Sequence, residues 1–127
     1  MDKKIISTAA FLGMLAIILG AFGAHALKKV LSIEQLSTFE TGVKYQMYHA
    51  LLLLFIGLTD KINDNIKSQI YNLIIIGVIL FSGSIYLLAT KNITNLDFSI
   101  IGVATPIGGV FLIAGWSLLF YKFISQK

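Results

Sequence analysis

Four long stretches of this sequence carry no formal charge, and this feature restricts the fold more than any other. They cover residues 5–27, 45–59, 68–90 and 98–121. All but the second have the length of about 20 apolar residues that a helix needs to cross the roughly 30 Å hydrocarbon layer of a membrane. They lack the alternation of a membrane β-barrel, so each is expected to be a helix with its backbone groups bonded internally. The sequence therefore predicts an all-α fold: an integral membrane four-helix bundle, with residues 1–127 as a single transmembrane domain.

The second stretch, residues 45–59, is the shortest. The residues before it can lengthen it into a helix that crosses the membrane. Apolar residues recur there at helical spacing, with charged residues between them. They are Leu36, Phe39, Val43 and Met47. Ser32 and Gln35 fit a capping box, which marks a helix start. We therefore expect an amphipathic interfacial lead-in from about residue 32 that runs into the second span, with a bend near Gly42.

The composition agrees with a lipid environment. Hydrophobic residues make up 57% of the chain and charged residues 13%, whereas a soluble domain has about 25% charged residues. The chain has no cysteine, which excludes disulfides, thiol catalysis and cysteine-held metal sites. Its basic residues are lysines scattered between the apolar stretches, so we expect a lipid bilayer as partner and no nucleic acid.

The segment "AFGAHALKK", residues 21–29, raises the alternative of a cleaved signal peptide. Its small-x-small spacing suits signal peptidase, but a signal core has about 7–15 apolar residues and this stretch is longer. We therefore expect the first span to stay in the protein. Four crossings place both termini on one side, and the lysine bias of six against four favours the cytoplasm.

His25 and His49 are the only histidines, and they are the candidate functional or structural polar pair. His25 ends the first span and His49 begins the second, so both rings are expected at similar depth near one face. Ionisable groups inside a membrane are functional candidates by default. Three interpretations remain open: a neutral packing hydrogen bond, a proton- or ion-responsive site supported by Glu40, Tyr45 or Tyr48, and metal or haem ligation. Two ring nitrogens are an incomplete metal shell, so we predict no cofactor and no metal site.

Small residues predict where helices approach closely. Gly20 and Gly23 lie with Ala16 and Ala24 on one face of the first span, which favours packing inside the bundle over a homodimer interface. In the last span, Pro106 removes a backbone donor, and Gly108 and Gly109 follow it. A kink or local unwinding is expected there, with Thr105 helping to satisfy the freed groups. Such breaks can build transport sites.

Four motifs in series resemble one known family. They are "GAFGAHALK" at 20–28, "YQMYHALLLL" at 45–54, "FSGSIYLL" at 81–88 and "TPIGGVFLIAGW" at 105–116. This order is similar to that of the YwdK/YgdD family of uncharacterised small bacterial inner-membrane proteins. The resemblance implies four transmembrane helices, a location in the bacterial cytoplasmic (inner) membrane and no catalytic assignment. Its characteristic residues correspond here to Gly20, Gly23, His25, Tyr45, His49, Ser82, Gly83, Pro106, Gly108, Gly109, Gly115 and Trp116.

No catalytic constellation is recognisable, and Trp116, Tyr121 and Tyr71 suggest only an interfacial aromatic belt. The favoured expectation is a non-enzymatic structural or accessory bundle, with a possible homo-oligomer or membrane-protein partner. The alternative is a small transporter, channel or lipid-handling oligomer that uses the His25/His49 face and the Pro106 break. A haem- or metal-binding redox subunit is the third expectation.

Overall fold

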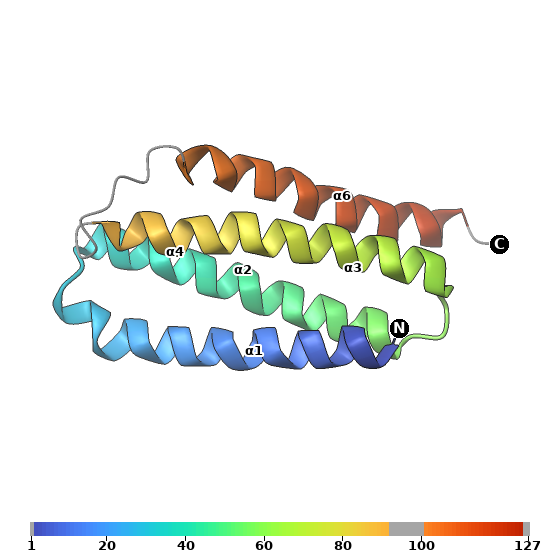
Figure 1. Ribbon diagram of the computed structural model, residues 1–127, viewed down its shortest axis with the longest axis horizontal. Helices are drawn as coiled ribbons and strands as arrows, with labels where there is room; N and C mark the ends of the chain where they lie inside the picture. The colour runs from blue at the N-terminus through green and yellow to red at the C-terminus, as the bar shows by residue number, and fades with distance from the viewer. Residues whose placement is uncertain (1, 92–100, 126–127) are drawn as a thin grey trace.

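The computed structural model describes residues 2–91 and 101–125, and within these ranges the chain is helical without a strand (Figure 1). The elements in chain order are α1 (Asp2–His25), the 3₁₀ turn η1 (Leu27–Lys29), α2 (Ile33–Leu58), α3 (Asp64–Val78), the π-helical turn η2 (Ile79–Gly83), α4 (Ser84–Ala89), the 3₁₀ turn η3 (Ile101–Val103) and α6 (Ala104–Ile124). α3, η2 and α4 form one continuous rod. The predicted all-α membrane bundle is confirmed.

Three helical segments of the described chain are long and apolar enough to cross a membrane. They are Asp2–Lys29, Asp64–Ala89 and Ile101–Ile124. α2 is absent from this set, because polar residues such as Glu40, Lys44 and Gln46 lower the hydropathy of its first two thirds. Figure 1 shows that α1 and the α3–α4 rod run in the same direction, with α2 returning between them. If these three helices cross, α2 must cross back between the first two, as the predicted four-span topology requires.

The start of α2 follows the predicted capping box. The Ser32 hydroxyl accepts from the Gln35 backbone N–H at 3.1 Å, and the Gln35 side-chain oxygen accepts from the Ser32 N–H at 3.0 Å. The helical lead-in is therefore present. It continues through Gly42 as one uninterrupted helix, so the expected bend there was wrong. Gly42 instead makes room for α4, because a Cβ at this position would lie 2.7 Å from the Tyr86 ring.

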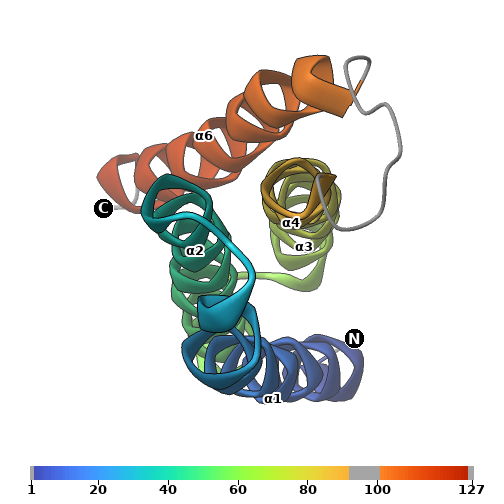
Figure 2. The ribbon, with the colours of Figure 1, turned by 90° about the vertical axis from the view of Figure 1, so that its left-hand side faces the viewer.

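The helices form an open arrangement rather than a closed square. Figure 2 shows α1 and α6 at opposite ends, with α2 and the α3–α4 rod between them. α1 packs mainly on α2, and α6 packs mainly on α3 and η2. The main apolar core lies between α1, α2 and α3 and includes Ile5, Leu53, Ile56, Ile70 and Ile74. α6 therefore leaves most of its surface uncovered.

α6 approaches the α3–α4 rod at glycines. A Cβ on Gly108 would meet the backbone of Leu80 and Phe81 and would lie 2.9 Å from the Gly77 carbonyl oxygen. A Cβ on Gly115 would lie 2.6 Å from Ile74. The π-helical turn lies where Gly108 makes this contact. Backbone thus packs on backbone, as small residues permit in membrane helices.

Candidate functional site

The most buried polar ring of the bundle belongs to His49 on α2, which is only 4% exposed. Its Nδ1 lies 2.6 Å from the Tyr45 carbonyl oxygen, and its Nε2 lies 3.0 Å from the indole Nε1 of Trp116 on α6. An indole N–H is only a donor, so Nε2 must be the acceptor. The proton of the neutral ring is then on Nδ1, from which it is donated to the Tyr45 carbonyl. Both nitrogens of His49 are satisfied by this arrangement.

His25 does not join this site, so the prediction that the two imidazoles lie close together at one depth was wrong. The Gln46 side chain donates to the Leu12 carbonyl at 2.8 Å, and Gly13 faces Ala50 across the α1–α2 contact. His49 is therefore level with the middle of α1. Twelve residues of helix separate Gly13 from His25, which is about 18 Å. One haem iron cannot take both rings as axial ligands at that distance.

The supporting residues predicted around His49 divide into two groups. Tyr45 stacks on His49 with ring centroids 6.4 Å apart. It also packs against Phe81 of η2, with ring centroids 5.0 Å apart. Tyr48 lies beside Tyr45 at 5.6 Å but is 53% exposed. Glu40 is exposed and precedes His49 by nine residues, which is about 14 Å of helix. Only Tyr45 is part of the site, and Glu40 is outside it.

The proline of the last span does not break a helix. α6 begins at Ala104, so Pro106 lies in its first turn, where a missing N–H costs little. The kink or local unwinding expected at Pro106 was therefore wrong, because α6 is uninterrupted from Ala104 to Ile124. Thr105 bonds the Ser84 hydroxyl on α4 instead of satisfying freed backbone groups. The residues from 98 to 100, where the last span was expected to begin, lie outside the described chain.

The small-residue prediction for the first span holds in part. A Cβ on Gly20 would lie 3.4 Å from Val43, and one on Gly23 would lie 3.1 Å from Phe39. Ala16 is fully buried. These residues pack α1 against α2 inside the bundle. Ala24, in contrast, is exposed.

Sequence reasoning missed a polar network around Gln46. Tyr86 on α4 donates to the Gln46 side-chain oxygen at 2.6 Å, and Gln46 donates to the Leu12 carbonyl on α1. Ser82 of η2 donates to the Gly42 carbonyl at 2.8 Å. Three elements are thereby joined through one buried amide. The only available signal was a glutamine within a charge-free stretch.

A second missed contact ties the N-terminus to α3. The Lys67 ammonium is 3.0 Å from the Asp2 carboxylate, and the Lys67 side chain is 3% exposed. Thr8 and Tyr71 are hydrogen-bonded at 3.0 Å above this pair, and the Lys4 ammonium lies 5.3 Å from the Tyr71 ring centre. In the sequence, Lys67 is only one of the six lysines counted for the cytoplasmic side. It is instead the buried partner of an ion pair.

Trp116 has a different role from the one predicted. It is the thirteenth of the 21 residues of α6, so it lies near the middle of the span rather than in an interfacial belt. Its indole is held by His49 in an edge-on arrangement with ring centroids 6.0 Å apart. The expected interfacial anchoring by Trp116 was therefore wrong. The sequence shows that His49 and Trp116 lie in different spans, but it does not show that the two rings meet.

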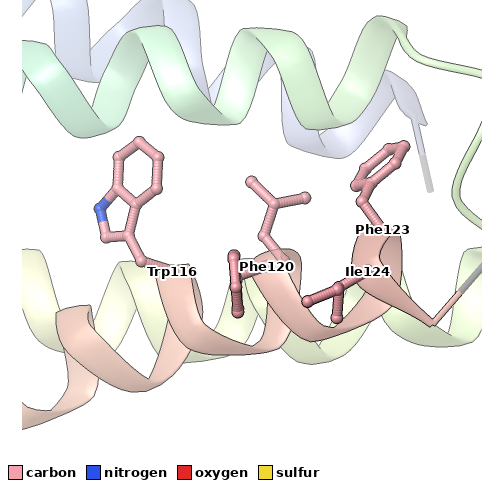
Figure 3. Close-up of a pocket in the computed structure, with 5 residues that line it drawn as sticks. Trp116, Phe120, Phe123 and Ile124 are labelled. Carbon is pink, nitrogen blue, oxygen red and sulfur yellow. The ribbon is translucent and has the colours of Figure 1, made fainter.

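Two hollows flank Trp116. The His49 cavity, about 340 Å³, is lined by Tyr45, His49, Phe81, Gly109, Leu112, Ile113 and Trp116. The Phe120 cavity, about 490 Å³, is lined by Trp116, Leu119, Phe120, Phe123 and Ile124. Figure 3 shows Trp116 and Phe123 leaving α6 on the side of the α2 ribbon. No group of three metal-ligating side chains occurs in residues 2–91 and 101–125.

Comparison with known proteins agrees with the bundle and names no activity. The family described as "Protein of unknown function (DUF423)" matches residues 19–109. The UPF0382 membrane protein SSP2132 of Staphylococcus saprophyticus is 45% identical, over 92% of this chain and 93% of its own. The UPF0382 membrane protein YwdK of Bacillus subtilis is 39% identical, over 92% of this chain and 93% of its own.

The UPF0382 inner membrane protein YgdD of Escherichia coli is 36% identical, over 94% of this chain and 88% of its own. No solved structure matches this chain. The matched family region contains His25, His49, Pro106, Gly108 and Gly109. Four motifs in series, a helical membrane bundle and relatives that cover nearly the whole chain lead to one assignment: the chain belongs to the DUF423 (UPF0382) family of membrane proteins of unknown function.

Proposed function

We propose that this protein is a non-enzymatic accessory bundle of the bacterial cytoplasmic membrane, with both termini in the cytoplasm. Its partner would be a second copy or another membrane protein. The support for a role without catalysis is the use of its buried polar groups. Among the described residues, no buried side-chain nitrogen or oxygen lacks a hydrogen-bond partner.

These groups are hydrogen-bonded between helices. His49 binds Trp116, Gln46 binds Leu12 and Tyr86, and Ser82 binds Gly42. Interhelical hydrogen bonds of this kind fix the packing of membrane helices. A general acid or base must reach the proton that it transfers, whereas both ring nitrogens of His49 are bonded to groups of the bundle itself. The arrangement therefore favours a scaffold.

The proposed membrane and orientation are supported by the name of one relative and by the distribution of lysines. The Escherichia coli relative is named an inner membrane protein. Figure 1 has the start of α1 and the end of α6 at the same end of the bundle. The lysine bias favours the cytoplasm for that end.

The transport alternative keeps one structural support, the His49 cavity. Its other two supports were the pairing of His25 with His49 and a break at Pro106, and neither occurs in the structure. We therefore rank transport below the accessory role.

Two measurements test the proposal. Proteoliposomes of the purified protein are expected to show proton and potassium flux equal to that of empty vesicles. Native membranes, solubilised gently and resolved on a non-denaturing gel, are expected to contain the protein in a complex larger than the single bundle. A flux that His49→Ala abolishes would overturn the non-transport part, and migration as a lone 13.9 kDa chain would overturn the accessory part.

A further inference from the structure

The His49 cavity combines features of a ligand site that the scaffold role does not use. We propose that it binds the ring of a neutral, membrane-soluble molecule of the quinone class, whose hydrocarbon tail continues along the Phe120 cavity. Small-molecule sites are concave, mostly apolar and typically about 300–1,000 Å³, with a few placed polar groups. The His49 cavity, at about 340 Å³, lies at the small end of this range.

Depth in the membrane determines the charge of the ligand. α6 has 21 residues, or about 31 Å, which matches the roughly 30 Å hydrocarbon layer. The cavity extends from Gly109 to Trp116, so it lies between about 8 and 18 Å from the start of α6. A phosphate headgroup at that depth would be costly to desolvate. We therefore assign an uncharged polar part to the ligand.

The walls favour a flat ring. Tyr45, Phe81 and Trp116 supply aromatic surfaces from three different elements, and aromatic faces pair well in tilted or offset geometry. Gly109 contributes a wall without a side chain, and the nearest atom to a Cβ there would be on Phe81 at 3.9 Å. The space opposite the rings is thus kept open by glycine.

The polar groups favour a carbonyl on that ring. Both nitrogens of His49 are engaged, and the indole N–H of Trp116 is donated to His49. Tyr45 is 41% exposed, and its hydroxyl makes no hydrogen bond to the part of the chain that the structure describes. A phenol hydroxyl that faces lipid can donate to a ligand acceptor. A quinone carbonyl supplies that acceptor without adding charge.

The Phe120 cavity can hold the hydrocarbon tail of the ligand. It shares Trp116 with the His49 cavity and follows α6 as far as Ile124, a further eight residues or about 12 Å. Its lining is apolar and, apart from Trp116, carries no hydrogen-bonding side chain. Figure 3 shows this lining along one side of α6. A ring in the first cavity and a chain in the second would both contact Trp116.

Trp116 is the only tryptophan of the chain, so its fluorescence reports on this site alone. The test uses purified protein in phosphatidylglycerol/phosphatidylcholine nanodiscs, titrated with a benzoquinone that carries a ten-carbon tail. The expected result is quenching that saturates. A carbonyl-free benzene with the same tail is expected to bind at least tenfold more weakly.

Four variants test where the ligand binds. Gly109→Leu fills the cavity and is expected to weaken quinone binding at least tenfold, whereas Val110→Leu, on an exposed part of α6, leaves it unchanged. Tyr45→Phe is expected to weaken binding about 3–10-fold. If Gly109→Leu lowers the melting temperature, Ile113→Phe narrows the same cavity from another wall.

Several results would overturn the proposal. They are quenching that rises linearly with quinone, as simple partitioning would give, equal binding of the carbonyl-free analogue, or quinone binding that survives both cavity-filling variants. Phospholipid with brominated acyl chains tests the competing occupant. If that lipid quenches Trp116, and Gly109→Leu relieves its quenching but not that of quinone, the cavity holds an acyl chain instead.

Discussion

The Nε2 atom of His49 accepts a hydrogen bond from the indole of Trp116 at 3.0 Å, and this bond joins two helices that otherwise contact each other little. α6 rests mainly on α3 and η2, so the indole is its main link to α2. The two residues are 67 positions apart in sequence. Their contact also separates the two cavities, so it affects both the packing and the proposed site.

The first prediction concerns this bond. Trp116→Phe leaves the buried Nε2 of His49 without a donor, which should lower the unfolding free energy by about 1–2 kcal/mol. His49→Phe should cost a similar amount. Because the two side chains form one interaction, the double variant should be less destabilised than the sum of the single variants by about 0.5–1.5 kcal/mol. Denaturant titration in mild detergent measures all three, and strict additivity would contradict the bond.

A second prediction tests the close contact of α6 with the α3–α4 rod. Gly108→Ala places a methyl group against backbone atoms that cannot move aside, so the unfolding free energy should fall by about 2–3 kcal/mol. Gly83→Ala is the matched control, because nothing lies within 4 Å of a Cβ there. It should leave the melting temperature unchanged or raise it slightly. Equal effects at both glycines would refute the contact.

The third prediction concerns the buried amide of Gln46. Gln46→Leu removes the bonds to Leu12 and Tyr86 and leaves the Tyr86 hydroxyl without its partner. A loss of about 1–3 kcal/mol in unfolding free energy is expected. Tyr48→Phe, at an exposed tyrosine on the same helix, should change stability by less than about 0.5 kcal/mol. A tolerated Gln46→Leu would mean that the network does not hold the three helices.

A fourth prediction follows from the ion pair between Lys67 and Asp2. Asp2→Asn leaves a buried ammonium without its partner and should cost about 1–2 kcal/mol, reduced from the fully buried case because Asp2 is half-exposed. Lys67→Met removes the charge itself and should cost less. In the Lys67→Met background, Asp2→Asn should have almost no further effect. Thermal melts in detergent at moderate salt give the comparison, and a larger loss from Lys67→Met would reverse our interpretation.

The fifth prediction concerns topology and uses the absence of cysteine from the chain. Val30→Cys and Ser125→Cys introduce exposed thiols at opposite ends of the bundle. A membrane-impermeant maleimide should label Val30→Cys in intact cells but Ser125→Cys only after the inner membrane is opened. The reverse pattern would place both termini outside the cytoplasm.

The sequence by itself determined the class of fold. A charge-free run of more than 20 residues has few stable options other than a membrane helix, because lipid cannot satisfy free backbone groups. Ser32 and Gln35 likewise fixed the start of α2, because a capping box is a local interaction within one turn. Gly20 and Gly23 indicated a close helix contact, and the structure places Val43 and Phe39 there.

Only the tertiary structure decided which polar groups meet. The sequence suggested that His25 and His49 pair, because the chain reverses direction between them. However, α2 begins well before its charge-free part, at Ile33. His49 is therefore level with the middle of α1, about 18 Å from the depth of His25. Pro106 looked like a break because the start of α6 could not be read from hydropathy. The rotation and offset of each helix depend on contacts such as Gly108 against the α3–α4 rod, which involve distant parts of the chain. For that reason the sequence does not identify Trp116 of α6 as the partner of His49.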